Sequence, residues 1–139
     1  MGKAARCKSE NESLIYPWGN EFDPQNANTA ESKIGTTSDV GKFSPQGDSP
    51  YGCADMAGNV SEWCNDWFNE NEYKQRQAAT VKDPRGPQKG DVRVLRGGSF
   101  NLNHGFAHCA IRLGDFPYYY IDYRGFRVAS ASVKLESDD

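Results

Sequence analysis

Residues 55–67 read DMAGNVSEWCNDW and hold two of the three tryptophans of this 139-residue chain. Gly58-Asn59 is a strong turn dipeptide because both residue types tolerate positive φ. Side chains alternate between the two faces of an extended segment, which puts Trp63 and Trp67 on the same face. The stretch therefore predicts a tight turn followed by a strand that buries both rings.

The same turn gathers oxygen atoms that suit a hard cation. Asp55 precedes the turn and Glu62 follows it, so the two carboxylates can approach each other, with the carbonyls of Gly58 and Val60 between them. Calcium takes about six to eight oxygen ligands in flexible geometry. The spacing therefore allows a calcium site, and the alternative is a solvated turn in front of a buried strand.

Length and composition limit the classes of protein to consider. A chain of 139 residues forms one domain, and its formal charge of −3, without a basic stripe, gives no reason to expect nucleic acid. No apolar run approaches the ~20 residues needed to span a bilayer. The first residues lack the apolar core of a signal peptide, so the cytoplasm is the default location.

The four cysteines are not arranged as a zinc site. Cys7, Cys53, Cys64 and Cys109 include no C-x-x-C pair, and the chain has only two histidines. Four cysteines permit three complete disulfide pairings, between which the sequence does not choose. Without a signal peptide, free thiols are the default expectation.

Regular structure is expected to be sparse, because glycine and proline are plentiful and helical periodicity is scarce. Residues 1–6 read as the end of a helix, and residues 21–50 as a long polar loop that is either functional or ordered by something such as a bound ion. Further strands are expected at 92–95 and at 124–129, the latter with Phe126 and Val128 facing one way. Residues 101–123 are expected to be irregular and 130–139 to form a polar tail.

Four motifs in this order resemble the formylglycine-generating enzyme family, also called sulfatase-modifying factors: YPWGN at 16–20, YG with DMAGNVSEW at 51–63, LRGGSF at 95–100 and GFRV at 125–128. The resemblance covers residues 1–129 and matches the C-terminal half of a family domain. It implies an α+β fold of the C-type lectin-like class, with little regular structure, long loops and bound calcium.

The resemblance places the family calcium motif on the turn already described. Asp55 and Glu62 would bind the ion through their side chains, and Gly58 and Val60 through their carbonyls. A second family calcium site uses an asparagine that matches Asn28 and a later acidic loop, which is shortened here. The resemblance thus favours the first calcium site and leaves the second in doubt.

The chemistry of the family requires two copper-binding cysteines shortly after the Gly-Gly-Ser motif. Leu102 stands at the first of these positions, and Cys109 matches a later structural cysteine. Copper(I) needs thiolate ligands, so copper is not expected, and His104 and His108 are poor substitutes. A structural disulfide between Cys7 and Cys109 is a further possibility, because a related pairing occurs in some family members.

Residues 100–133 contain no Lys, Glu, Gln, Met or Trp, whereas the other 105 residues contain 26 of them. Codons that end in C cannot encode these five amino acids, and diversity-generating retroelements, whose variable proteins share this fold, produce such a bias. The alternative is an aromatic-rich loop with ordinary core residues. Candidate varied positions are Leu102, Phe106, Ile111, Leu113, Phe116, Tyr119, Ile121 and Tyr123.

These observations predict a non-catalytic, calcium-stabilised domain that presents the 100–123 loop to a protein or small ligand. Exposed Tyr and Phe side chains suit recognition because they give a large contact area at low entropic cost. The alternative is a formylglycine-generating oxidase that acts on a sulfatase cysteine. A homo-oligomer or a separate N-terminal half is the expected partner. The candidate ligand-binding residues are Phe106, Phe116, Tyr118, Tyr119, Tyr120 and Tyr123.

Overall fold

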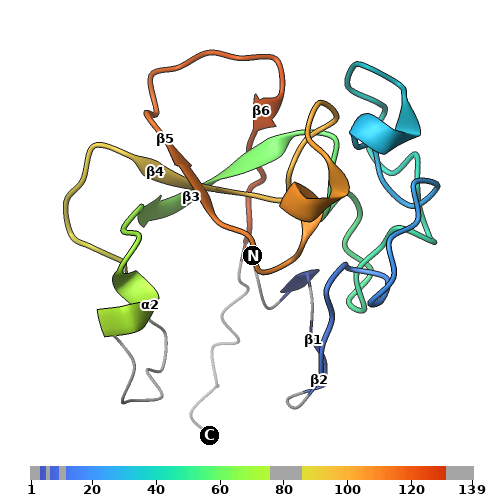
Figure 1. Ribbon diagram of the computed structural model, residues 1–139, viewed down its shortest axis with the longest axis horizontal. Helices are drawn as coiled ribbons and strands as arrows, with labels where there is room; N and C mark the ends of the chain where they lie inside the picture. Colours follow the sequence, from blue (N-terminus) through green and yellow to red (C-terminus); the bar gives the residue numbers. More distant parts are fainter. Residues whose placement is uncertain (1–3, 6, 10–11, 76–85, 131–139) are drawn as a thin grey trace, which may run out of the picture.

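The computed structural model of the chain describes residues 4–5, 7–9, 12–75 and 86–130 and contains little regular structure (Figure 1). Long loops connect short strands, and no described helix is long and apolar enough to cross a membrane. The elements in chain order are β1 (Cys7–Ser9), β2 (Glu12–Ser13), the 3-10 helix η1 (Ala30–Ser32), β3 (Ser61–Trp67), α2 (Glu72–Gln75), β4 (Arg93–Arg96), the 3-10 helix η2 (His104–Ala107), β5 (Leu113–Asp115) and β6 (Arg124–Gly125).

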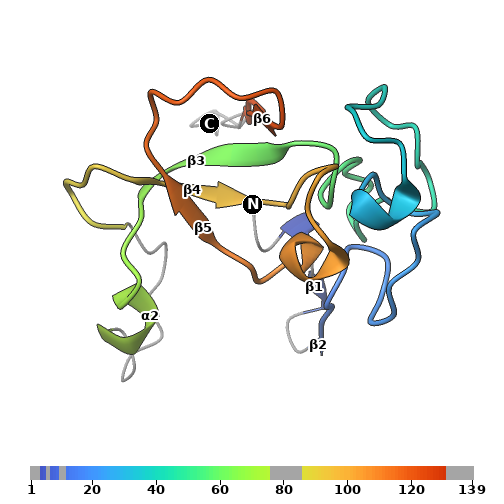
Figure 2. The same ribbon diagram turned by 45° about the horizontal axis from the view of Figure 1, so that its top comes forward.

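A four-stranded mixed sheet with the order β5-β4-β3-β6 forms the centre of the molecule (Figure 2). β3 pairs antiparallel with β4, where Trp63 lies opposite Leu95, and β4 pairs antiparallel with β5. The β3–β6 pair is parallel, with Ser61 opposite Arg124. Few helices, a mixed sheet and long loops confirm the α+β, C-type lectin-like fold predicted from the sequence.

The expected strand at 60–67 is confirmed, but its tryptophans are only half-buried. Each indole ring is instead covered by a guanidinium: Arg124 lies 5.5 Å from the ring centroid of Trp63, and Arg93 lies 3.5 Å from that of Trp67. An arginine can cover a ring through cation–π contact while keeping part of its surface wet. The rings therefore lie under arginine side chains and not inside an apolar core.

Two strand predictions were wrong in extent. The expected strand at 124–129 is limited to β6, and Phe126 and Val128 are 75% and 85% exposed. The chain leaves the sheet after Gly125 because Arg127 turns to bind Glu62. β5 lies within the stretch predicted to be irregular, since three residues with Gly114 at the centre carry no visible alternation.

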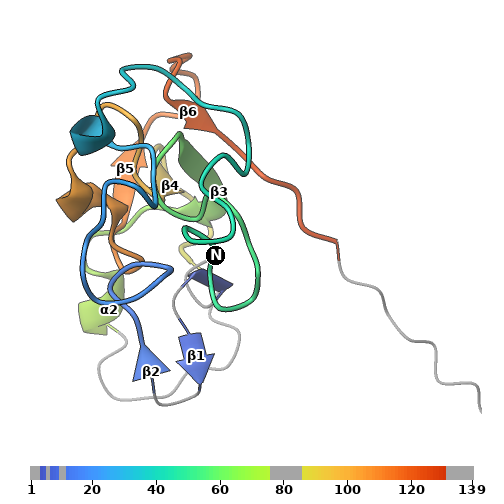
Figure 3. The ribbon, with the colours of Figure 1, turned by 90° about the vertical axis from the view of Figure 1, so that its right-hand side faces the viewer.

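The long loop at 21–50 lies beside the end of the sheet where β3 begins (Figures 1 and 3). Two buried asparagines order it: Asn28 donates from Nδ2 to the Thr36 carbonyl at 2.9 Å, and Asn59 Oδ1 accepts from the Ser38 N–H at 2.9 Å. The backbone of Asn59 also donates to the Asn28 carbonyl at 2.8 Å. Amide side chains thus replace missing secondary structure, because buried polar groups need partners.

The apolar core is small and divided. One cluster contains Ala5, Met56 and Cys109, and a second contains Tyr16, Ala57 and Ala107. Both clusters include a residue from the turn at 55–59, so this turn joins the two halves of the core. Ala4 and Ala5 are helical, as expected for the end of a helix. The other residues of that helix end and nearly all of the polar tail lie outside the described residues.

Candidate functional site

The turn before β3 has an unusual backbone. Asp55, Gly58 and Asn59 have φ values of 52°, 77° and 63°. A Cβ added to Gly58 would lie 2.4 Å from the Asn28 carbonyl oxygen, so only glycine fits at this position. The Gly58 N–H donates to the Gly97 carbonyl at 2.7 Å, which ties the turn to the Gly-Gly pair after β4.

Glu62 and Arg127 form a bidentate ion pair behind this turn. The Glu62 carboxylate accepts from Arg127 Nε at 2.6 Å and Nη2 at 2.5 Å, and its side chain is only 8% exposed. Arg127 also donates to the carbonyls of Ala54 and Asp55 at 3.1 and 2.9 Å. The hydrogen bonds to Glu62 raise the pKa of Arg127 above its ordinary value, against the opposing effect of burial.

Two of the four calcium ligands predicted from the sequence, Asp55 and Glu62, lie beside one guanidinium, because Arg127 binds the Asp55 carbonyl and the Glu62 carboxylate. Asp55 Oδ2 accepts from the Gly41 N–H at 2.7 Å. Among the described residues, no hydrogen bond reaches the carbonyl oxygens of Gly58 or Val60. All four predicted ligand atoms are oxygens, as calcium requires. A carboxylate has about four lone-pair sites, so Glu62 keeps lone pairs for an ion while it accepts two hydrogen bonds from Arg127.

Side chains alone would not complete such a site. The described part of the chain contains no group of three or more His, Cys, Asp or Glu residues that could hold a metal ion. Backbone carbonyls would have to supply the remaining ligands. Asn28, the candidate ligand of a second calcium site, is 1% exposed, and its Oδ1 accepts from the Ser32 hydroxyl at 3.3 Å.

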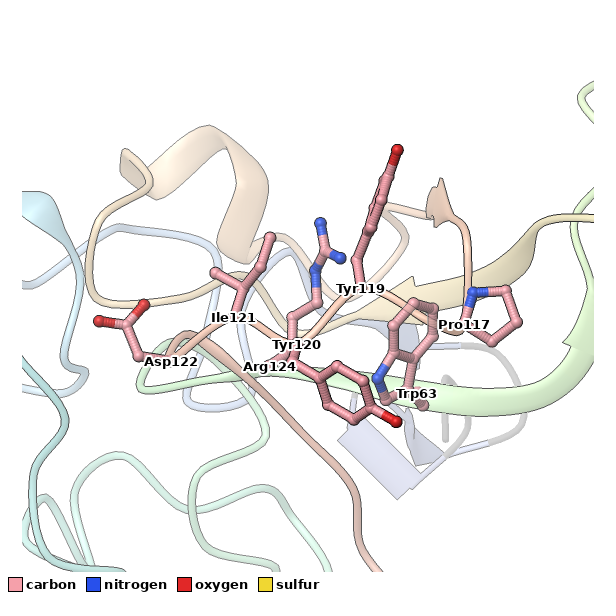
Figure 4. A pocket seen from close by; sticks show the side chains of 7 residues that line it. All are labelled: Trp63, Pro117, Tyr119, Tyr120, Ile121, Asp122 and Arg124. Carbon is pink, nitrogen blue, oxygen red and sulfur yellow. The ribbon is translucent and has the colours of Figure 1, made fainter.

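Aromatic residues after β5 surround an open pocket of about 440 Å³ (Figure 4). Tyr118, Tyr119 and Tyr120 are 61%, 48% and 98% exposed. The Tyr118 ring stacks on Phe116 at 5.4 Å and meets the edge of Tyr119 at 5.1 Å. The residues that line the pocket are Trp63, Pro117, Tyr119, Tyr120, Ile121, Asp122 and Arg124.

Arg124 forms one wall of this aromatic pocket. Its side chain is 9% exposed, pairs with the Asp115 carboxylate and lies over the rings of Trp63 and Tyr123. Its Nη1 atom is buried and has no hydrogen-bond partner among the residues that the structure describes. The loop therefore rests on a buried cation, while its tyrosines face solvent.

The structure separates the candidate ligand-binding residues into two groups. Tyr119 and Tyr120 line the pocket, and Phe116 and Tyr118 pack beside Tyr119. Phe106 instead lies in η2, and Tyr123 packs edge-on against Phe100 at 6.5 Å. Sequence analysis missed the pocket residues Trp63 and Arg124, which the parallel pairing of β3 and β6 brings to the loop. No local pattern in the sequence reports such a pairing.

Of the residues that follow the Gly-Gly-Ser motif, Leu102 stands where the family resemblance places a copper-binding cysteine, and Cys109 matches a later structural cysteine. Leu102 follows the Gly-Gly-Ser motif, and buried Cys109 has its Sγ 3.7 Å from the Ala5 carbonyl. Cys53 and Cys64 are half-buried free thiols, and burial raises the pKa of Cys64. The Cys7 side chain, and with it the predicted Cys7–Cys109 disulfide, lies outside the described part of the structure.

Each of the two histidines has a separate partner. His104 donates from Nδ1 to the Glu31 carboxylate at 2.8 Å, and its backbone N–H donates to the same carboxylate at 2.9 Å. Burial raises the pKa of Glu31, but these bonds and one from Thr29 outweigh it and lower the pKa to about 2. His108 Nε2 lies 2.9 Å from the Tyr16 hydroxyl. The histidines therefore belong to loop-packing contacts.

Comparison with known proteins places the chain in a family. The family described as "Sulfatase-modifying factor enzyme 1-like domain" matches residues 1–132. A formylglycine-generating enzyme of Thermomonospora curvata is 35% identical over 131 residues, covering 83% of this chain and 42% of the relative. The mouse protein named "Inactive C-alpha-formylglycine-generating enzyme 2" is 33% identical and covers 89% of this chain and 39% of the relative.

Solved structures show the same fold. The variable protein 1 of Treponema denticola is 25% identical with a TM-score of 0.68, covering 90% of this chain and 41% of that protein. PvdO of Pseudomonas aeruginosa is 26% identical with a TM-score of 0.70, covering 90% of this chain and 47% of that protein. The chain thus spans less than half the length of these relatives. It belongs to the sulfatase-modifying factor family.

Proposed function

We propose that this chain is a binding domain that recognises a protein or small ligand through the aromatic pocket after β5. The observation that carries the proposal is the group of mutually packed, exposed rings of Phe116, Tyr118 and Tyr119, next to the exposed Tyr120 that lines the pocket with Tyr119. Exposed aromatic patches mark interaction sites, and tyrosine offers contact area with little loss of entropy. The structural likeness to a variable protein agrees with a recognition role for this loop.

The second candidate function is the oxidase chemistry of the formylglycine-generating relatives, which the 35% identity favours. Against it, the residue after the Gly-Gly-Ser motif that matches a copper-binding cysteine is Leu102. A copper(I) ion needs soft thiolate ligands, which leucine cannot supply. Incubation with copper(I), oxygen and a Cys-x-Pro-x-Arg peptide should therefore yield no formylglycine above a no-protein control.

Calcium at Asp55, Gly58, Val60 and Glu62 is part of the same proposal. The support is the set of oxygen donors at the turn and the buried position of the Glu62 carboxylate. A bound ion would supply positive charge to two carboxylates and to carbonyls that lack hydrogen bonds among the described residues. Its role would be to stabilise the turn that joins the core clusters.

A displayed library of random peptides, selected on the purified protein, tests the binding role. Selected peptides should bind the wild type and lose at least about tenfold in affinity, or about 1.4 kcal/mol, when Tyr118, Tyr119 and Tyr120 are all replaced by alanine. Tyr51→Ala is the matched control, because Tyr51 is 60% exposed and does not line the pocket. Peptides that bind the triple variant unchanged, or formylglycine in the oxidase assay, would overturn the proposal.

A further inference from the structure

A second cavity, of about 800 Å³, lies between β3, β4 and α2, and Trp63 is the one described residue that it shares with the aromatic pocket. In Figures 1 and 2, α2 lies below the end of the sheet. Arg96, Arg112 and Tyr73 all line this cavity. We propose that these three residues form a binding site for an oxyanion, the phosphate or carboxylate group of a small molecule.

Strand register brings the two arginines together. β4 and β5 pair antiparallel, with Leu95 opposite Leu113. The pairing ends there, at the first residue of β5, and the next residues outward on the two strands are Arg96 and Arg112. Opposite residues project from the same face of a sheet, and both arginines do line the same cavity. Like charges in such a pair repel, so this arrangement favours an anion between them.

Tyr73 connects the two guanidinium groups. Its hydroxyl accepts from Arg96 Nη2 at 3.4 Å, and the guanidinium carbon of Arg112 lies 4.6 Å from the centroid of its ring. Because the hydroxyl accepts from Arg96, its own proton remains available to a ligand. Tyr73 therefore brings its own O–H donor close to both guanidinium groups.

Both arginines are held in place and keep donors to spare. Arg96 Nη1 donates to the carbonyls of Cys109 and Ile111 at 3.1 and 3.3 Å. Arg112 Nη2 donates to the Asn69 carbonyl at 3.4 Å, and its guanidinium also lies 5.3 Å from the Phe68 ring. A stacked guanidinium that is fixed at one edge is already oriented for an oxyanion.

The charges of Arg96 and Arg112 are not neutralised by an ion pair within the described residues. Three acidic side chains line the same cavity, but each has another hydrogen-bond partner. Glu62 binds Arg127, Asp66 accepts from the Gly86 N–H at 3.3 Å, and Glu72 accepts from Asn69 Nδ2 at 3.4 Å. Carbonyl oxygens orient a guanidinium without removing its charge, and the uncharged donors that bind Asp66 and Glu72 likewise do not remove theirs. An anionic ligand would therefore bind at Arg96, Arg112 and Tyr73, where two guanidinium groups and a hydroxyl lie together.

The test is titration of the whole chain with inorganic phosphate and, separately, with acetate at constant ionic strength, followed by NMR of the arginine Nε–H groups. Saturable shifts at Arg96 and Arg112, with a dissociation constant of about 1 mM, are expected for at least one anion. The stronger of the two anions identifies the ligand class. Shifts that rise linearly without saturation for both anions would overturn the proposal.

Matched variants locate the binding. Arg112→Gln should weaken binding at least about tenfold, and Tyr73→Phe should weaken it less while keeping the ring under Arg112. Arg93→Gln is the control, because Arg93 also stacks on a ring and donates to a carbonyl but does not line the cavity. If Arg93→Gln weakens binding as much as Arg112→Gln does, or if Tyr73→Phe and Arg112→Gln both bind as the wild type does, the site is wrong.

Discussion

The turn at 55–62 and the aromatic loop at 116–123 differ in how tightly neighbouring residues constrain them. A Cβ added to Gly58 would lie 2.4 Å from the Asn28 carbonyl oxygen, and Glu62 is held by two hydrogen bonds from Arg127. In the loop, Tyr118 and Tyr119 pack mainly on each other, and Tyr120 is 98% exposed. We therefore expect the fold to depend on the turn, and the loop to accept changes of side chain at little cost to stability.

This difference predicts which property, stability or binding, a substitution in each region will change. Changes in the turn should act on the free energy of unfolding, because they disturb buried polar contacts and both core clusters. Changes in the loop should act on binding and leave folding intact. If substitutions in the turn and in the loop both changed stability, or both changed binding, the two regions would not have separate roles.

Gly58→Ala is expected to have the largest effect. The new Cβ would lie 2.4 Å from the Asn28 carbonyl oxygen, at a φ of 77°. Positive φ alone costs an alanine roughly 1–2 kcal/mol, and the clash should bring the loss to about 3 kcal/mol or more. Urea unfolding measures it.

Gly52→Ala is the control for this variant. Gly52 has a φ of 70°, but nothing lies within 4 Å of its added Cβ. Its cost should remain at the roughly 1–2 kcal/mol of backbone strain. Equal losses for the two variants would show that the close approach to Asn28 does not constrain the turn.

Removal of calcium is expected to have the next largest effect. An ion that binds only the folded state adds about 2.7 kcal/mol at a free concentration of 100 times its dissociation constant. Excess chelator should therefore lower the melting temperature, and Asp55→Asn should abolish most of the response. Asp39→Asn, which removes one charge at an exposed residue, is the control. A melting curve that chelator leaves unchanged would refute calcium binding at the turn.

The turn, β3 and the fold class could be predicted from the sequence, because the motifs that specify them are local. Gly58-Asn59 predicted a turn from residues that tolerate positive φ, and the alternation after it predicted β3. The order of four motifs predicted the family and the fold class. These features depend on neighbouring residues, so a linear reading can detect them.

The parts that were missed depend on contacts between distant residues. Arg127 lies 65 positions from Glu62, and Arg124 reaches Trp63 through a parallel strand pair. Neither contact leaves a periodic pattern, and β5 is too short to show one. The alternation of Phe126 and Val128 predicts that the strand continues, but Arg127 between them binds the Ala54 and Asp55 carbonyls and draws the chain away from the sheet.

Glu31→Gln tests a contact that is less constrained than the turn at 55–62 and more constrained than the aromatic loop. The pKa of Glu31 falls from 4.5 to about 2 in the folded protein, so the unfolded state binds a proton more readily between these values. The ionised side chain therefore stabilises the fold fully above pH 4.5, and this stabilisation is lost as pH falls toward 2. Because His104 is half exposed, the loss at pH 7 should be about 1 kcal/mol after screening.

Thermal melting of wild type and Glu31→Gln across pH 2–7 measures this effect. The melting temperatures should differ at pH 7 and converge as pH falls from 4.5 to about 2. Glu21→Gln removes an equal charge from an exposed side chain and is the control. A gap between wild type and Glu31→Gln that stays constant over the whole range would show that ionisation of Glu31 does not contribute.

Tyr120→Ala should have the smallest effect on stability. The side chain is 98% exposed, so its removal should change the free energy of unfolding by no more than about 0.5 kcal/mol. The same substitution removes a ring that borders the aromatic pocket, and it should weaken the selected peptides by about 1 kcal/mol or more. Urea unfolding and a binding titration on the same sample separate the two effects. A loss of stability larger than the loss of binding would mean that Tyr120 supports the fold, and the loop could not vary freely.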